Sequence, residues 1–163
     1  MKHGFAYLSQ NRFLSVPNDA SNKPFGVAGI PYDGAVTNRP GARFAPAAIR
    51  QASQMLCDGI HPFFNTSPYE FIRDLGDLAT PNTDLTAMRA SLAEQIPALL
   101  AQYHMCWLGG DHSITLGLLR AYRVWAGQPL AVLHFDAHCD TWEDHFGEPS
   151  GHGTWVYEAI QEG

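Results

Sequence analysis

The sequence predicts an α/β fold of three layers, in which helices cover both faces of a mainly parallel sheet. The first observation is that short apolar segments bounded by Gly or Pro alternate along the chain with amphipathic helical segments. The second is that these apolar segments are continuous rather than alternating, which is typical of strands buried on both faces. In such sheets ligands bind beyond the carboxyl ends of the strands, so functional residues are expected there.

The expected elements follow one another from residue 25 onward. Residues 1–24 are polar and Asn-rich and should form an N-terminal arm, whereas residues 25–163 should belong to one α/β domain. Pro46 suits a first helical turn, and Thr83 or Asp84 can cap a helix that Pro97 should kink. We expect strands at 25–30, 71–75, 105–108 and 130–135, and helices at 46–56, 84–103 and 114–125.

The composition limits the classes of partner that the chain can bind. The chain has 163 residues, of which 45% are hydrophobic, enough for one compact core. Its 10 basic and 16 acidic residues give a net charge of −6, and no cluster of Lys and Arg is available to bind nucleic acid. No apolar run approaches the roughly 18 residues of a membrane span, and three widely spaced cysteines without a CxxC pair suit a reducing compartment. We therefore expect a cytoplasmic protein with no nucleic-acid or membrane partner.

Two of the expected strand ends carry side chains that can bind metal. His112 follows a double glycine after the third expected strand, at the start of the next helix. Asp136, His138 and Asp140 alternate after the fourth expected strand. In extended backbone, residues two apart point to the same side, so these three side chains should converge. The four residues are therefore predicted metal ligands.

The donor types narrow the choice of metal. Mixed carboxylate and imidazole ligands suit a borderline divalent ion such as manganese, nickel or zinc. A bound cation also removes the cost of burying unpaired carboxylates. His134 is one residue out of phase with the ligand pattern, so it is expected to face away and to be structural.

Three ordered motifs resemble signatures of the ureohydrolase superfamily, which includes arginases and agmatinases. They are GGDHS at 109–113, HFDAHCD at 134–140 and GHG at 151–153. Three upstream segments resemble the agmatinase branch: GIPYDG at 29–34, RPGAR at 39–43 and PAAIR at 46–50. The resemblance runs from about residue 25 to the end and implies the N-terminal portion of an arginase-like domain, here truncated.

The resemblance also implies roles for the candidate residues. His112, Asp136 and Asp140 would hold one metal ion, while Asp136, as a bridging ligand, and His138 would reach a second. The two divalent ions, Mn2+ by resemblance with Ni2+ or Zn2+ left open, would lower the pKa of a water molecule and supply the nucleophile. Asp140 would hydrogen-bond that nucleophile, and His152 would deliver a proton to the leaving amine, so both are expected to be catalytic.

Part of the family's site has no counterpart in this sequence. Family members complete the metal site with a further Asp-x-Asp strand end and bind the guanidinium through a Glu. Residues 154–163 offer only Glu158 and Glu162, and Asp74 and Asp77 have the wrong spacing and precede the GGDHS motif. We therefore expect a truncated product or fragment that is not catalytically competent alone, whereas the full-length form would be a homo-oligomer, either trimer or hexamer.

The implied reaction is hydrolysis of a guanidino compound to urea and an amine. The acidic segment 142–148 favours a substrate with a cationic tail, such as agmatine, which would give putrescine. Arg39 and Arg43 leave open a guanidino-acid hydrolase such as a guanidinobutyrase. Two further alternatives are a zinc-dependent deacetylase of the same fold and a non-catalytic metal-binding fragment or subunit. No substrate-binding residue is assigned.

Overall fold

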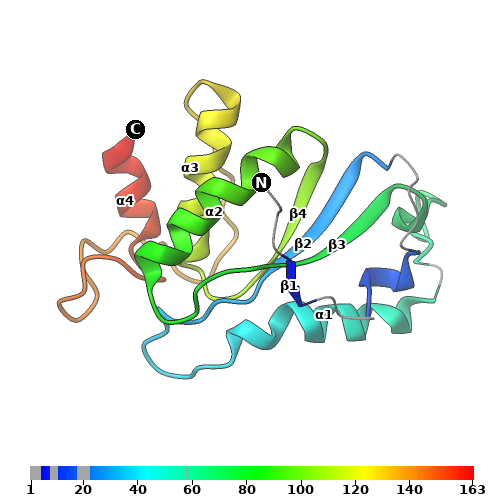
Figure 1. The fold of residues 1–163 in the computed structure, drawn as a ribbon, viewed down its shortest axis with the longest axis horizontal. Coiled ribbons are helices and arrows are strands. Elements are labelled where there is room, and N and C mark those ends of the chain that lie inside the picture. Colours follow the sequence, from blue (N-terminus) through cyan, green and yellow to red (C-terminus); the bar gives the residue numbers. More distant parts are fainter. Residues whose placement is uncertain (1–4, 8–10, 18–22, 58) are drawn as a thin grey trace.

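The computed structural model describes residues 5–7, 11–17, 23–57 and 59–163. Its described strands form one four-stranded sheet with the order β1-β3-β2-β4 (Figure 1). The central strand β2 pairs in parallel with both neighbours, and β1 pairs antiparallel with β3 at one edge. The strands are β1 Phe5–Tyr7, β2 Phe25–Ile30, β3 Ile72–Leu78 and β4 His104–Gly109.

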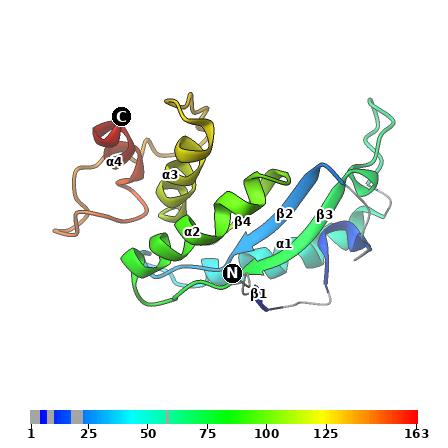
Figure 2. The ribbon, with the colours of Figure 1, turned by 45° about the horizontal axis from the view of Figure 1, so that its top comes forward.

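Helices cover both faces of this sheet, which confirms the predicted fold class. Figures 1 and 2 show α1 on one face and α2 on the opposite face. Helix α3 packs against α2, and α4 lies beside α3. The helices are α1 Ala45–Ser53, α2 Leu85–Leu100, α3 Ile114–Ala126 and α4 Trp155–Glu162, with short 3-10 turns at Phe13–Ser15, Ala42–Phe44, Gln54–Leu56 and Pro68–Glu70. None of the described helices combines the length and apolar character needed to cross a membrane.

The elements form where local signals and burial agree. Asp84 caps α2, because its Oδ1 accepts a hydrogen bond of 2.8 Å from the backbone N–H of Ala87. The helix continues through Pro97 to Leu100. Met88, Leu92 and Ile96 repeat at four-residue spacing on α2 and are fully buried in the main core. This stripe fixes α2 on the sheet.

The described parts of residues 1–24 contribute to the fold. Phe5–Tyr7 adds the edge strand β1. Leu14 and Val16 are buried in a second core cluster that also contains Val27 of β2 and Ile72 of β3. The segment expected as an arm therefore packs against the domain at these positions.

The expected strand at 130–135 is not formed, and this prediction is wrong. The segment is irregular, and the side chains of Leu133 and Phe135 are 82% and 87% exposed. A strand takes its backbone hydrogen bonds from a neighbouring strand, and among the described residues no strand pairs with this segment. Its apolar composition indicates a buried strand, but composition does not supply the neighbour.

A buried ionic network lies between α1 and β3. The guanidinium of Arg50 donates to Oδ2 of Asp74 at 2.7 Å and to Oδ1 of Asp77 at 2.5 Å. All three residues are buried. Gly29 of β2 faces this network, and a Cβ at that position would collide with Asp77. Asp74 and Asp77 are thus engaged by Arg50 and are not available to complete a metal site.

Candidate metal centre

The turn after β4 is fixed against the loop that follows β2. The parallel register pairs Ile30 with Gly109, so both strands end at the same edge of the sheet. Gly110 has a φ of +24°, and a Cβ there would lie 2.5 Å from the carbonyl oxygens of both Ile30 and Tyr32. The backbone N–H of Asp111 then donates to the carbonyl of Tyr32 at 2.7 Å. His112 follows at a position set by these contacts.

Asp111 holds this turn rather than joining the candidate ligands. Its Oδ1 accepts from the backbone N–H of Ser113 at 2.9 Å, and its Oδ2 accepts from the backbone N–H of Ala35 at 3.0 Å. The side chain is buried. Burial of Tyr32, together with the charge of Asp111, raises the pKa of the Tyr32 hydroxyl. The hydrogen bonds of Asp111 therefore hold this turn without the help of a metal ion.

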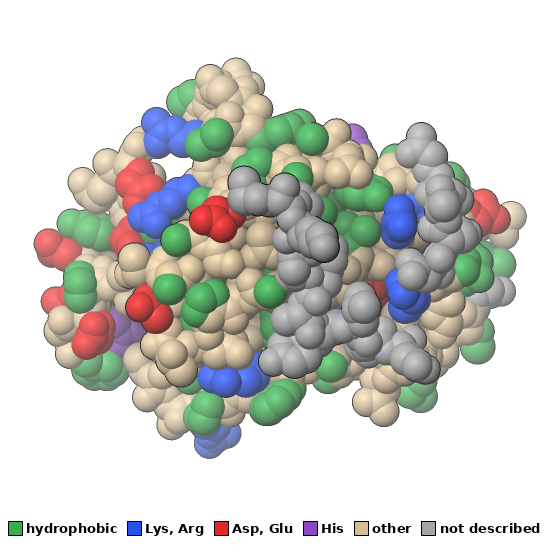
Figure 3. Space-filling model, in the orientation of Figure 1, with side chains coloured by type: hydrophobic (Ala, Val, Ile, Leu, Met, Phe, Trp, Pro, Cys, Tyr) green, Lys and Arg blue, Asp and Glu red, His purple; other side chains and the backbone are tan. Residues whose placement is uncertain are grey.

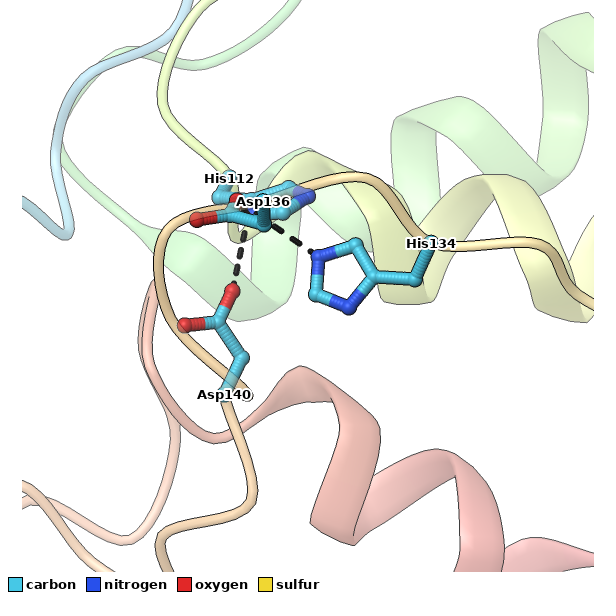
Figure 4. A group of neighbouring side chains, drawn as sticks. All are labelled: His112, His134, Asp136 and Asp140. Carbon is cyan, nitrogen blue, oxygen red and sulfur yellow. Dashed lines mark ion pairs between the residues drawn. The ribbon is translucent and has the colours of Figure 1, made fainter.

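Four side chains place donor atoms within 4.8 Å of one another. Figure 4 shows how they lie together. Nδ1 of His112 lies 3.2 Å from Oδ2 of Asp136 and 2.8 Å from Oδ2 of Asp140. The fourth member is His134, whose Nε2 lies 3.5 Å from Oδ2 of Asp136. Three of the four ligands predicted from the sequence, His112, Asp136 and Asp140, thus lie together.

His134 and His138 do not follow the alternation expected of a strand. We expected His134 to face away, and this is wrong, because residues 130–135 form no strand and alternation does not hold there. The His138 side chain is 82% exposed and lies outside the four-residue group. Its Nδ1 is nevertheless 3.4 Å from Oδ1 of Asp136. Asp136 therefore presents one oxygen to His112 and the other to His138.

The surroundings of the Asp136 carboxyl favour its ionised form. The backbone N–H of His138 donates to its Oδ1 at 2.8 Å, and this bond, with the nearby charge of His112, lowers the pKa of Asp136. An ionised carboxylate accepts hydrogen bonds or binds cations at both oxygens. The ionised Asp136 carboxylate could therefore bind a cation.

Asp140 is held by the start of α4. It has a φ of +51°, a conformation that non-glycine residues rarely adopt. The indole Nε1–H of Trp155 donates to its Oδ2 at 2.7 Å, and the backbone N–H of Val156 donates to its carbonyl at 3.1 Å. Sequence reasoning missed Trp155, because an aromatic residue at a helix start signals burial and nothing more specific.

His152 lies in a different group of side chains. Its Nδ1 is 2.8 Å from the carbonyl oxygen of Ala35, which can only accept a hydrogen bond, so Nδ1 carries the hydrogen of this contact. The His152 ring packs against His145, with 4.8 Å between centroids, and His145 packs edge-on against Trp142. His152 is not among the four residues whose donor atoms gather around Asp136.

The donor set fits a divalent metal ion. Two imidazoles and two carboxylates match the preferences of manganese, zinc and related ions. Nε2 of His134 is buried and has no hydrogen-bond partner within the part of the chain that the structure describes. A buried polar atom without a partner is costly, and a cation would satisfy this one. The cluster therefore has the composition of a metal site. It also contains a buried imidazole nitrogen, Nε2 of His134, that could bind the ion.

Comparison with known proteins places this site in a family context. Residues 23–163 match the arginase family. An agmatinase from Chromobacterium violaceum is 40% identical over 149 residues, which are 89% of this chain and 46% of that protein. A guanidinopropionase from Pseudomonas aeruginosa is 35% identical over 161 residues, covering 93% of this chain and 48% of that protein.

Solved structures agree in fold. A hypothetical agmatinase from Burkholderia thailandensis superposes with a TM-score of 0.83 at 34% identity, covering 94% of this chain and 50% of that one. A proclavaminate amidino hydrolase from Streptomyces clavuligerus gives the same score and identity, with 97% and 53% coverage. The chain spans about half the length of the curated relatives it matches. With the arginase family matched over residues 23–163, this chain belongs to that family.

Proposed function

We propose that this chain carries part of the active site of a cytoplasmic, metal-dependent hydrolase that cleaves a guanidino compound into urea and an amine. The lead substrate is agmatine, which gives putrescine. The observation that carries the proposal is the meeting of His112, Asp136 and Asp140 beyond the carboxyl end of β4, in a chain of the arginase family. We further propose that the enzyme works as a homo-oligomer, either trimer or hexamer.

We assign His112, Asp136 and Asp140 to one divalent ion, and Asp136 with His138 to a second. Mn2+ is the preferred metal, ahead of Ni2+ and Zn2+. The shared position suits Asp136, because its Oδ2 faces His112 while its Oδ1 faces His138. His134, whose Nε2 lies 3.5 Å from Oδ2 of Asp136, would offer the first ion one further imidazole nitrogen. When bound, such ions lower the pKa of a water molecule toward neutrality and so supply a nucleophile.

The protein groups have separate tasks. Asp140 has one oxygen fixed by Trp155, and its carboxylate can accept a further hydrogen bond from the nucleophile and orient it. His152 keeps its Nδ1 hydrogen on the Ala35 carbonyl, so Nε2 is the atom that would pass a proton to the leaving amine. Asp140 and His152 are therefore our catalytic residues.

The charge around the site favours a cationic substrate tail. Glu143, Asp144 and Glu148 are exposed on the loop that precedes His152. Figure 3 shows acidic side chains at the end of the molecule that carries α4 and this loop, together with some basic side chains. Arg43, one of two arginines that would suit a carboxylate tail, is instead paired with the buried Asp33. These features support an amine tail such as that of agmatine.

A guanidino acid is the second candidate substrate. The relative named guanidinopropionase is 35% identical to this chain. Arg39 is exposed and is available to bind a substrate carboxylate. The choice between the two substrate classes therefore depends on whether the acidic loop or Arg39 faces the tail.

Urea release tests the proposal directly. The chain, loaded with Mn2+, Ni2+ or Zn2+, is offered agmatine, 4-guanidinobutyrate, 3-guanidinopropionate and arginine. Alone it is expected to bind metal and release little urea. Joined to the second half of the Chromobacterium violaceum agmatinase, it is expected to act on agmatine first. A preference for the guanidino acids selects the second candidate, and no urea from any metal-loaded form contradicts the proposal.

A further inference from the structure

One buried indole touches three of the four residues in the candidate metal centre. Trp155 is the first residue of α4 and is 3% exposed. Besides its hydrogen bond to Asp140, its ring lies 5.0 Å from the ring of His112 and 4.9 Å from that of His134, measured between centroids. The two imidazoles are themselves 5.4 Å apart. The indole therefore forms one wall of the cluster.

Helix α4 carries this indole on a fixed support. Glu158 accepts from the Thr154 hydroxyl at 2.7 Å and pairs with Arg89 of α2 at 3.3 Å. At the other end of α4, Glu162 pairs with Arg120 of α3. The helix that places Trp155 is thus tied to both neighbouring helices, and the indole N–H has a defined direction.

We propose that Trp155 is a positioning residue for the metal centre, which fixes Asp140 and the two imidazoles and so sets the affinity for the ion. This inference rests on the metal-binding part of the proposed function. The indole N–H is a donor only and cannot itself bind a cation. The Asp140 oxygen that it contacts keeps a second lone pair for the ion, so the hydrogen bond and metal binding are compatible.

The hydrogen bond matters because it fixes the direction of the Asp140 carboxylate from the side of α4. Its positive φ is an uncommon conformation, and its carbonyl and carboxylate are held by the consecutive residues Trp155 and Val156. Without the indole N–H, the carboxylate loses the hydrogen bond that orients it from α4 and keeps its contact with His112. Loss of an outer partner that orients a metal ligand typically weakens metal binding by about 10- to 100-fold.

Trp155→Phe separates the hydrogen bond from the packing, because phenylalanine keeps an aromatic ring but has no N–H. Trp125→Phe is the matched control, since Trp125 is 55% exposed near the end of α3 and is not a member of the cluster. The affinities for Mn2+ and Zn2+ are measured by titration against a chromophoric chelator. We expect a loss of about 10- to 100-fold in Trp155→Phe and no change in Trp125→Phe.

The outcomes are distinguishable. If the unmodified chain binds neither ion, the proposed function fails. If it binds them and Trp155→Phe binds equally well, only the role of Trp155 is overturned. Should Trp155→Phe not fold, the indole 15N–1H signals of the unmodified chain are followed during Zn2+ addition and assigned through Phe variants of the other three tryptophans. The Trp155 signal should shift with the first equivalent of Zn2+, and an unmoved signal overturns the inference.

Discussion

Nδ1 of His112 lies 2.8 Å from Oδ2 of Asp140, so the turn after β4 and the irregular segment before α4 meet at one point. Each of the two side chains is held by contacts from a neighbouring part of the chain. The turn at residues 109–111 holds His112 in place, and the first residues of α4 hold Asp140. A metal ion bound between them would join these two parts of the chain and stabilise the fold.

Metal addition is therefore expected to raise the melting temperature of the chain. A ligand that binds only the folded state stabilises it by about 2.7 kcal/mol at a free concentration of 100 times Kd. Asp140→Asn should remove most of this gain, because it neutralises a carboxylate that we propose as a metal ligand. Differential scanning fluorimetry with and without Mn2+ measures both effects. Asp144→Asn, on the exposed loop, is the matched control and should retain the gain; equal responses in the two variants would exclude Asp140 from the site.

His138 and His134 are expected to affect different ions. His138 faces Oδ1 of Asp136, so His138→Asn should remove the second proposed ion. His134→Asn should weaken the first ion instead, because His134 faces the oxygen that also faces His112. His152→Phe should leave metal content unchanged. Metal per chain after dialysis, measured by inductively coupled plasma mass spectrometry, distinguishes the three, and equal losses would refute this division of roles.

Arg50 is expected to be essential for stability. Arg50→Met leaves Asp74 and Asp77 buried without a counter-charge, and breaking a buried ion pair from one side typically costs about 3–5 kcal/mol. Arg39→Met, at an exposed position, should change the free energy of unfolding by less than about 0.5 kcal/mol. Denaturant unfolding followed by circular dichroism gives both values. Similar midpoints for the two variants would show that the network contributes little.

The acid limit of stability is expected to depend on Arg43. The hydrogen bond from the Arg43 side chain is the main reason that the pKa of Asp33 is lowered. The backbone N–H groups of Gly41 and Arg43 also donate to Asp33 and lower its pKa further. Because the folded pKa lies below the unfolded value of about 3.9, ionised Asp33 stabilises the fold above that pH, and this contribution is lost as the pH falls through the folded pKa.

Arg43→Gln should therefore move the acid loss of stability to higher pH. Melting temperatures recorded between pH 6 and pH 2 test this shift, with Arg39→Gln as the matched control. If the melting temperatures of Arg43→Gln and the unmodified chain fall in the same way as the pH is lowered, Arg43 is not the cause of the low pKa of Asp33.

The sequence predicted the fold class and the strands at β2, β3 and β4, because short apolar segments alternate along the chain with amphipathic helices. The resemblance to the ureohydrolase motifs implied that His112 would share an ion with Asp136 and Asp140, and these three side chains do lie together. The prediction from sequence failed at residues 130–135, where strand formation depends on a neighbour that composition does not reveal. The orientation of His134 was wrong for the same reason. Trp155 escaped notice because its role depends on where α4 packs.

The most direct test of the metal centre is a crystal structure of the chain grown with Zn2+, with anomalous diffraction recorded at the zinc edge. The account predicts an anomalous peak between His112 Nδ1, Asp136 Oδ2 and Asp140 Oδ2, about 2.0–2.2 Å from each atom. A zinc-saturated crystal with no peak at this position, or with these three side chains directed away from one another, would contradict it.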